Sequence, residues 1–247
     1  PRRHNNALQD IAWPTNAHLL DRQANELRTS GLDRINVRHD TLDARQFEEI
    51  TRRDNLDDAL RGIMAAQAAG FQNIRLNAVA VKGLIESQII PLTKFCVENG
   101  LHLRFIEFMP LNSSGNWTDN DVLTGRKIRE MIDDEFGELT PCQRDDPSQP
   151  ASDFRMANHD CLIGFINSVS EPFCGDCNRV RLTADGKIRN CLFSHEEWDL
   201  RSLLRSAAND QDIKQLIFEC IENKKAAHGI GTAEFAKPQR AMYQIGG

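Results

Sequence analysis

IRLNAVAV at residues 74–81 and LRFIEFM at residues 103–109 are the two stretches that decide the fold. Both are rich in branched and large apolar side chains, which favour β-strands. A helix is expected between them over residues 87–99, and Gly100 ends it. A strand, a helix and a second strand in this order form a right-handed unit of a parallel sheet. The sequence therefore predicts an α/β fold.

The same alternation continues on the N-terminal side of these stretches. Residues 11–13 and 35–37 read as short strands, and helices are expected over residues 18–28 and 55–69. Four parallel strands are too few for a closed eight-stranded barrel. The set predicts part of a (β/α) barrel, with parallel strands and flanking helices.

The second half of the chain has a different pattern. A loop rich in Pro, Asp and Ser at residues 145–153 marks a boundary. We divide the chain into a partial barrel over residues 1–115 and a C-terminal α+β region over residues 116–247. The elements expected in that region are helices over residues 124–136, 199–206 and 210–223, and strands over residues 153–157 and 161–169.

Composition excludes several classes of protein. The 247 residues carry a formal net charge of −6, which argues against a protein that coats nucleic acid. No stretch approaches 18 uninterrupted apolar residues, so we expect no membrane-spanning helix. The seven cysteines are an odd number in a chain too long to need disulfides, which favours a reducing cytoplasm. Because the first residue is Pro1, the sequence reads as if cut from something longer.

Three cysteines are closely spaced, at Cys174, Cys177 and Cys191. Soft sulfur ligands select zinc or an iron–sulfur cluster over hard metals. His195 would complete a Cys₃His zinc site, which is a standard closed structural site. The spacing alone leaves open a zinc-stabilised α/β binding module without catalysis, an iron–sulfur cluster and unligated thiols.

Two arginines, Arg179 and Arg181, share one face of the strand that follows the first two cysteines. They could compensate the charge of the thiolates, or they could grip phosphate oxygens or a purine. A hairpin turn at residues 183–186 is expected to bring Cys191 back beside the other cysteines. We expect the other histidines to be mostly at the surface, namely residues 4, 18, 39, 102, 159 and 228.

The cysteine segment, FCGDCNRVRLTADGK at residues 173–187 followed by CLF at residues 191–193, resembles the C-terminal cluster segment of the GTP 3′,8-cyclases. These are radical S-adenosylmethionine enzymes of molybdenum cofactor biosynthesis. The resemblance extends in order through residues 35–43 and 104–110 to the terminal Ile245-Gly246-Gly247, and so covers nearly the whole chain.

The resemblance implies an incomplete (β/α)₆ barrel in which two [4Fe–4S] clusters face each other. In that family the N-terminal cluster cleaves S-adenosylmethionine, and the adenosyl radical takes a hydrogen from C3′ of GTP. The carbon radical then attacks C8 of the guanine to give (8S)-3′,8-cyclo-7,8-dihydroguanosine 5′-triphosphate. The C-terminal cluster holds the guanine. GTP is therefore the implied ligand, and a homodimer the implied assembly.

The resemblance also assigns roles to residues of this chain, none of them catalytic. It implies that Cys174, Cys177 and Cys191 hold one [4Fe–4S] cluster, and that Met109 contacts S-adenosylmethionine. The terminal Gly246-Gly247 resembles a tail that reaches into the active site. The implied GTP contacts are Arg179, the backbone of Val180, Arg181 and, near the triphosphate where the family has a lysine, Arg75.

The sequence departs from the family in several places. The Cys-x₃-Cys-x₂-Cys loop and the Gly-Gly-Glu-Pro strand of the family are absent. Pro14 stands where the family has a threonine that contacts GTP, and Arg38 where a serine contacts S-adenosylmethionine. We expect a fragment or truncated copy that is inactive alone. The competing interpretation is a chain repurposed to bind a nucleotide or deliver a cluster.

Overall fold

The structure, a computed structural model, describes residues 8–111 and 117–245. Contacts between residues divide the chain into two compact units. The first contains the described residues up to Phe108 together with Asp121–Asp145 and Ala151–Asn167. The second contains the described residues of Met109–Asn120, Asp146–Pro150 and the chain from Ser168 onward. Each unit is described by itself below.

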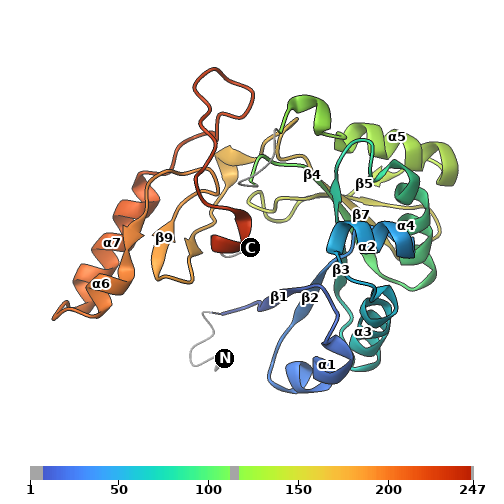
Figure 1. The fold of residues 1–247 in the computed structure, drawn as a ribbon, viewed down its shortest axis with the longest axis horizontal. Helices are drawn as coiled ribbons and strands as arrows, with labels where there is room; N and C mark the ends of the chain where they lie inside the picture. The colour runs from blue at the N-terminus through green and yellow to red at the C-terminus, as the bar shows by residue number, and fades with distance from the viewer. Residues whose placement is uncertain (1–7, 112–116, 246–247) are drawn as a thin grey trace. The chain divides into compact units, whose positions relative to one another are not determined.

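A seven-stranded sheet forms the centre of the first unit (Figure 1). Five neighbouring strands are parallel, and the two at one end of the sheet are antiparallel. The sheet is open, so the described residues form part of a barrel, as the sequence predicts. In spatial order the strands are β1 (Ala12–Thr15), β2 (Arg34–Arg38), β3 (Ile74–Ala80), β4 (His102–Glu107), β7 (Leu162–Ile166), β6 (Ser152–Arg155) and β5 (Thr140–Pro141).

Helices of the first unit connect the parallel strands. Because right-handed crossovers between strands that follow one another in order place every helix on the same face of a sheet, the helices form one layer. Figure 1 shows this layer beside the strands. The helices are α1 (Leu20–Thr29), α2 (Ala44–Thr51), α3 (Leu56–Ala68), α4 (Glu86–Glu98) and α5 (Gly125–Phe136).

The two faces of the sheet differ in polarity. Along β3 every second residue is buried, beginning with Ile74 and Leu76, and these side chains belong to the apolar core beneath the helices. The residues between them, Arg75 and Asn77, are polar and half-buried. Since side chains alternate across a strand, these polar side chains lie on the face opposite the helices. A face with polar side chains of this kind can receive a charged ligand.

The sequence missed one helix of the first unit. Helix α2 begins after Asp43, whose carboxylate accepts a hydrogen bond from the backbone N–H of Gln46 at 2.7 Å. Such a cap is recognisable as Asp followed three residues later by Gln. Strand β7 was expected as a β run, but its place beside β4 was not. The sheet therefore continues beyond residue 115, where the sequence placed the end of the partial barrel.

The second unit is built on a three-stranded antiparallel sheet of order β10-β9-β8. The strands are short: β8 is Arg181–Leu182, β9 is Lys187–Arg189 and β10 is Trp198–Asp199. Two helices follow them, α6 (Leu200–Leu204) and α7 (Asp210–Glu222), and single 3₁₀ turns occur at Cys174–Asp176 and Met242–Gln244. This unit contains part of the α+β region that the sequence predicts over residues 116–247, while residues 121–145 and 151–167 belong to the first unit.

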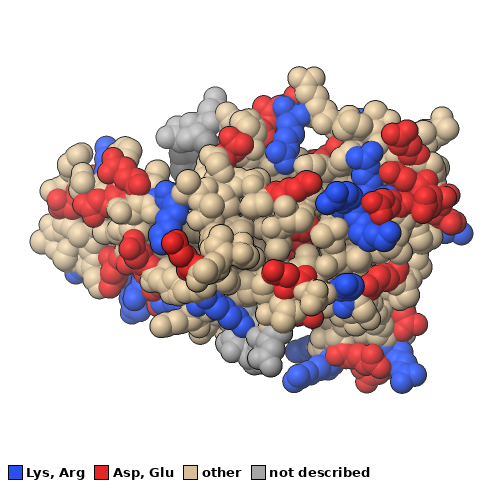
Figure 2. Space-filling model, turned by 90° about the horizontal axis from the view of Figure 1, so that it is seen from above, with Lys and Arg blue, Asp and Glu red and all other residues tan. Residues whose placement is uncertain are grey.

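Two general features of the described residues bear on function. None of their helices combines the length and the apolar character that crossing a membrane requires. On the face drawn in Figure 2, acidic and basic side chains are interspersed.

Candidate functional site

The first two cysteines of the second unit lie on one tight turn. A single 3₁₀ turn covers Cys174–Asp176, and the backbone N–H of Cys177 donates to the carbonyl oxygen of Cys174 at 3.2 Å. Both cysteines are half-buried and form no disulfide. The turn therefore presents two thiols from neighbouring positions on one short segment.

A hairpin returns the chain to this turn. Strands β8 and β9 pair Arg181 with Arg189, and continuing that register sets Cys191 opposite Arg179. The turn needs Gly186, because its φ of +84° lies in the left-handed region. A Cβ there would also lie 2.6 Å from the Cβ of Arg201. The hairpin expected from the sequence is thus present, and it returns Cys191 to the turn.

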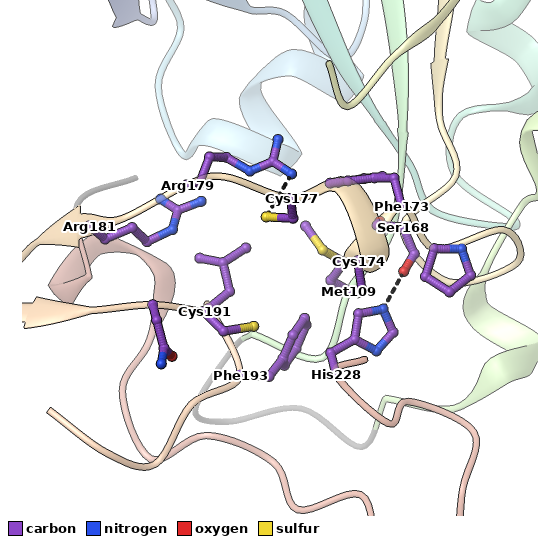
Figure 3. A pocket seen from close by; sticks show the side chains of 13 residues that line it. Met109, Ser168, Phe173, Cys174, Cys177, Arg179, Arg181, Cys191, Phe193 and His228 are labelled. Atoms are coloured by element: carbon purple, nitrogen blue, oxygen red, sulfur yellow. Dashed lines mark hydrogen bonds between the residues drawn. The ribbon is translucent and has the colours of Figure 1, made fainter. Parts of the chain in front are cut away.

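The three cysteines line one cavity of about 70 Å³, which we call the cysteine cavity (Figure 3). Its lining includes both arginines of the motif and Met109, and none of its described lining residues is a carboxylate. All of them belong to the second unit. The lining residues are Met109, Ser168, Pro172, Phe173, Cys174, Cys177, Arg179, Arg181, Asn190, Cys191, Leu192, Phe193 and His228.

Arg179 controls the charge of one thiol in the cysteine cavity. Burial alone would raise the pKa of Cys177, but the backbone N–H and guanidinium of Arg179 hold it below its ordinary value. The guanidinium Nη2 lies 3.1 Å from the Cys177 Sγ, and its carbon lies 4.5 Å from the ring centre of Phe173. Arg179 therefore favours the thiolate, the form that binds metal.

Cys174 has a different environment in the same cavity. Burial raises the pKa of its thiol. A hydrogen bond from the backbone N–H of His228 opposes that effect. The ring of His228 is fixed by a contact of 2.8 Å between its Nε2 and the carbonyl oxygen of Ser168, shown as a dashed line in Figure 3. The ring also packs against Phe193, with centroids 5.2 Å apart.

A lysine holds the two cysteine-bearing segments together. The ammonium of Lys224 donates to the carbonyl oxygen of Arg179 at 2.9 Å and to that of Asn190 at 2.7 Å. The side chain of Asn190 in turn donates to the carbonyl oxygen of Cys220 on α7, at 2.8 Å. Helix α7 thus fixes the spacing between the first two cysteines and the third.

The arrangement differs from a closed zinc site. Among the described residues, no three His, Cys, Asp or Glu side chains converge closely enough to share one metal ion. Tetrahedral zinc would hold its sulfur ligands about 3.8 Å apart, from a zinc–sulfur bond of about 2.3 Å. His195 is absent from the cysteine cavity. It lines an adjoining cavity, where its Nε2 lies 3.1 Å from the carbonyl oxygen of Ala236.

Arg75 lies in the first unit, on the polar face of the sheet. The register places it between Asn36 on β2 and His102 on β4. Burial, followed by the charges of Arg104 and Arg34, lowers its pKa to about 10. The carboxylates of Asp153 and Asp10, which are paired with Arg104 and Arg34, oppose this shift. Arg75 does not line the cysteine cavity.

The structure corrects the expectation for one histidine. The sequence predicts histidines that are mostly at the surface or solvated, but His39 is only 1% exposed, and His18, His102 and His228 are half-buried. The contacts of His228 reach residues about 60 positions away, and no local pattern signals such a contact. No local pattern signals the role of Lys224 either, because its hydrogen bonds also reach residues far away along the chain. The side chain of Val180 is 43% exposed, and Gly246-Gly247 lies outside the described residues.

Models of two protein families match the chain. The model for Molybdenum Cofactor Synthesis C matches residues 101–230, which include all three cysteines of the cavity and both arginines. The model for the Radical SAM superfamily matches residues 2–96, which include most of the parallel strands. The two matches together cover the sheet and the cysteine segment.

Several bacterial proteins are similar over nearly the whole chain, and each is named GTP 3′,8-cyclase. The protein of Rhodopirellula baltica is 48% identical over 97% of this chain and 67% of its own length. Those of Corynebacterium glutamicum and Mycolicibacterium smegmatis are 42% and 43% identical, each over 96% of this chain and over 64% and 67% of their own lengths. This chain spans about two thirds of these relatives, and it belongs to the GTP 3′,8-cyclase family of radical SAM proteins.

Proposed function

We propose that this chain serves the conversion of GTP to (8S)-3′,8-cyclo-7,8-dihydroguanosine 5′-triphosphate in molybdenum cofactor biosynthesis, a lyase reaction. Its cysteine cavity then forms the substrate-binding side of the reaction. The observation that supports this most strongly is the gathering of three cysteines and two arginines around one cavity, within the segment that matches the molybdenum cofactor family.

The donors of the cavity fit an iron–sulfur cluster. Three half-buried thiols are soft ligands, and the absence of carboxylates among the described lining residues disfavours a hard metal ion. Arg179 and Lys224 supply positive charge beside the thiolate of Cys177. With three protein ligands, a [4Fe–4S] cluster supplies one iron with an open coordination position, at which a purine atom can bind.

The arginines of the cavity would bind the substrate. The guanidinium groups of Arg179 and Arg181 offer paired N–H donors to phosphate or purine oxygens, and the backbone of Val180 between them offers a further contact. In the first unit, Arg75 would contact the triphosphate from the polar face of the sheet. Met109, which lines the cysteine cavity, would contact S-adenosylmethionine.

The radical-forming half of the reaction requires residues beyond those described. The printed sequence has no Cys-x₃-Cys-x₂-Cys motif to hold a second cluster. We therefore infer that this polypeptide binds one cluster and GTP but does not cleave S-adenosylmethionine alone. A homodimer and a cytoplasmic location stay predictions from the sequence.

Metal analysis after anaerobic reconstitution with iron and sulfide tests the proposal. The chain should hold about four irons, and Cys177→Ser should lose most of them. Cys142→Ser is the matched control, because Cys142 is also half-buried but lies outside the cavity. A chain that takes up one zinc and no iron, or a Cys177→Ser variant with full iron content, would contradict the proposal.

A further inference from the structure

A second cavity lies in the first unit, where strands β1 and β2 end. It measures about 220 Å³ and is closed by helix α2 and the first turn of α3. We call it the His39 cavity. It shares no lining residue with the cysteine cavity. Its polar lining includes His39, Arg38, Arg53 and Asn55.

His39 is the unusual group of this cavity. The residue is 1% exposed, and neither ring nitrogen has a hydrogen-bond partner among the described residues. Burial lowers the pKa of His39 to about 4, against the opposing charge of Asp40, so the ring is neutral at pH 7. A neutral ring has one donor and one acceptor, and leaving both unpaired in a buried position is unfavourable. The ring therefore requires a partner inside the cavity.

Two arginines, Arg38 and Arg53, line the same cavity as this ring. Arg38 pairs with Asp40 through its Nε at 3.1 Å, which leaves the outer nitrogens of its guanidinium available. Arg53 also lines the cavity, and no ion pair is found for it among the described residues. Asp57 and Asp58 both lie in the first turn of α3, but neither lines the cavity, and Asp58 is paired with Arg61. Among the described lining residues there are thus two arginines and one acid, Asp40, which is paired with Arg38.

The N-terminus of helix α3 adds to this field. Asn55 occupies the N-cap position but makes no capping hydrogen bond with its side chain. Its amide nitrogen instead lies 2.7 Å from Nδ1 of His18. The first backbone N–H groups of α3, a helix of 13 residues, therefore lack a side-chain cap. The uncapped start of a helix attracts anions.

We propose that the His39 cavity binds a small molecule through a compact oxyanion group, a phosphate or a carboxylate. The oxyanion accepts hydrogen bonds from the ring of His39 and from the guanidinium groups of Arg38 and Arg53. The cavity has room for about seven water molecules at about 30 Å³ each, which is enough for a small organic anion. The proposal is independent of the proposed function.

The test uses the full chain, with NMR detection of the His39 ring nitrogens at pH 7. Sodium phosphate and sodium malonate are titrated separately at constant ionic strength, with sodium chloride as the reference. One of the two anions should shift the His39 signals saturably, with a Kd of about 1 mM or below. A response to phosphate alone identifies a phosphate group, and a response to malonate alone identifies a carboxylate. If neither anion shifts the His39 signals saturably, the proposal is wrong.

Variants then test the contacts, with affinity measured by calorimetry. Arg53→Gln and His39→Phe should each weaken binding by about tenfold or more, as expected for loss of a charge-assisted hydrogen bond. Arg45→Gln is the matched control, because it removes the same charge from helix α2 at a side chain that is 89% exposed and paired with Glu49. Since Arg53 is exposed, its variant should fold even if His39→Phe does not. Equal affinity in the Arg53→Gln and Arg45→Gln variants would overturn the proposal.

Discussion

The chemistry of individual side chains in this protein is set by their close neighbours. Cys177 and Cys174 lie on the same turn, yet the pKa of one thiol is lowered and that of the other is raised. The difference arises because the hydrogen bonds and charge of Arg179 act on Cys177, whereas burial dominates at Cys174. Arg179 thus lowers the pKa of the Cys177 thiol, and its guanidinium is also available to a substrate.

Replacing Arg179 by glutamine should therefore make Cys177 less reactive. The pKa of the thiol should rise, and a rise of one unit would lower the thiolate fraction at pH 7 by about tenfold. The rate of alkylation of Cys177 by iodoacetamide, followed by mass spectrometry of the metal-free chain, measures this fraction. Alkylation of Cys142 in the same sample serves as the control. An unchanged rate at Cys177 would show that Arg179 does not tune the thiol.

His39 should make the stability of the first unit depend on pH. The pKa of His39 is about 4 in the folded protein, against 6.5 for an ordinary histidine such as that of the unfolded chain. Between these two pH values the unfolded chain therefore binds more protons than the folded protein. The stabilisation from the neutral ring is complete above pH 6.5 and is lost as the pH falls towards 4. The loss should be of the order of 3 kcal/mol.

Urea denaturation of the wild type and the His39→Gln variant from pH 7.5 to pH 4.5 measures this dependence. The wild type should lose more free energy of unfolding than the variant as the pH falls. His159→Gln, at an exposed histidine of the same unit, should follow the wild type. Parallel curves for wild type and His39→Gln would mean that His39 is not buried in its neutral form.

At the scale of elements, the β8–β9 hairpin positions the third cysteine. Gly186→Ala should destabilise the second unit by about 2 kcal/mol, because the left-handed φ is strained for alanine and its Cβ would meet Arg201. Gly231→Ala is the control, since it has a φ of +82° and no atom within 4 Å of the added Cβ. Urea denaturation should show the larger loss at Gly186. Equal losses would show that the contact with Arg201 is unimportant.

An ion cluster beneath the same hairpin holds the segment after Cys191. Glu197 accepts hydrogen bonds from Arg189, which is 2% exposed, and from Nη2 of Arg240 at 2.8 Å. Arg240 is also paired with Asp185, in the hairpin turn, at 2.9 Å. The cluster therefore joins the hairpin to the C-terminal segment.

Glu197→Gln should be strongly destabilising, because it leaves the buried charge of Arg189 without a carboxylate. Removing one partner of a buried pair costs about 3–5 kcal/mol. Glu196→Gln, at the exposed neighbouring residue, should change the free energy of unfolding by less than about 0.5 kcal/mol. Thermal or urea unfolding of both variants checks the difference. A stable Glu197→Gln protein would show that the cluster contributes little.

Local signals in the sequence predicted most of the helices. Helix α5 was expected over residues 124–136 and begins after Thr124, whose hydroxyl caps it. Helix α7 was expected over residues 210–223 and covers Asp210–Glu222, where Asn209 forms a capping box. Caps and apolar spacing are local, so a single sequence reveals them.

Features that depend on distant contacts could not be predicted. The burial of His39 depends on helices α2 and α3, and that of His228 on a loop far away in the sequence. The place of β7 beside β4 depends on a pairing across about 60 residues. The three cysteines and two arginines were recognisable, because their spacing on one hairpin is itself a local pattern.

At the scale of the whole molecule, each unit carries its own cavity and its own group of cations. The first unit has a polar sheet face with Arg75, and the second has the cysteine cavity. The family matches divide the chain in a similar way, at residues 2–96 and 101–230. The division into regions of residues 1–115 and 116–247 stays a prediction from the sequence.

The most direct measurement of the central claim is a GTP titration of the anaerobically reconstituted chain, followed by the visible absorption and EPR spectra of its cluster. The account predicts a brown protein whose spectra change saturably with GTP. Arg181→Gln should weaken this response by about tenfold, while Arg126→Gln, at an exposed arginine on α5, should not. A cluster whose spectra are indifferent to GTP would contradict the assignment of the cysteine cavity as the substrate site.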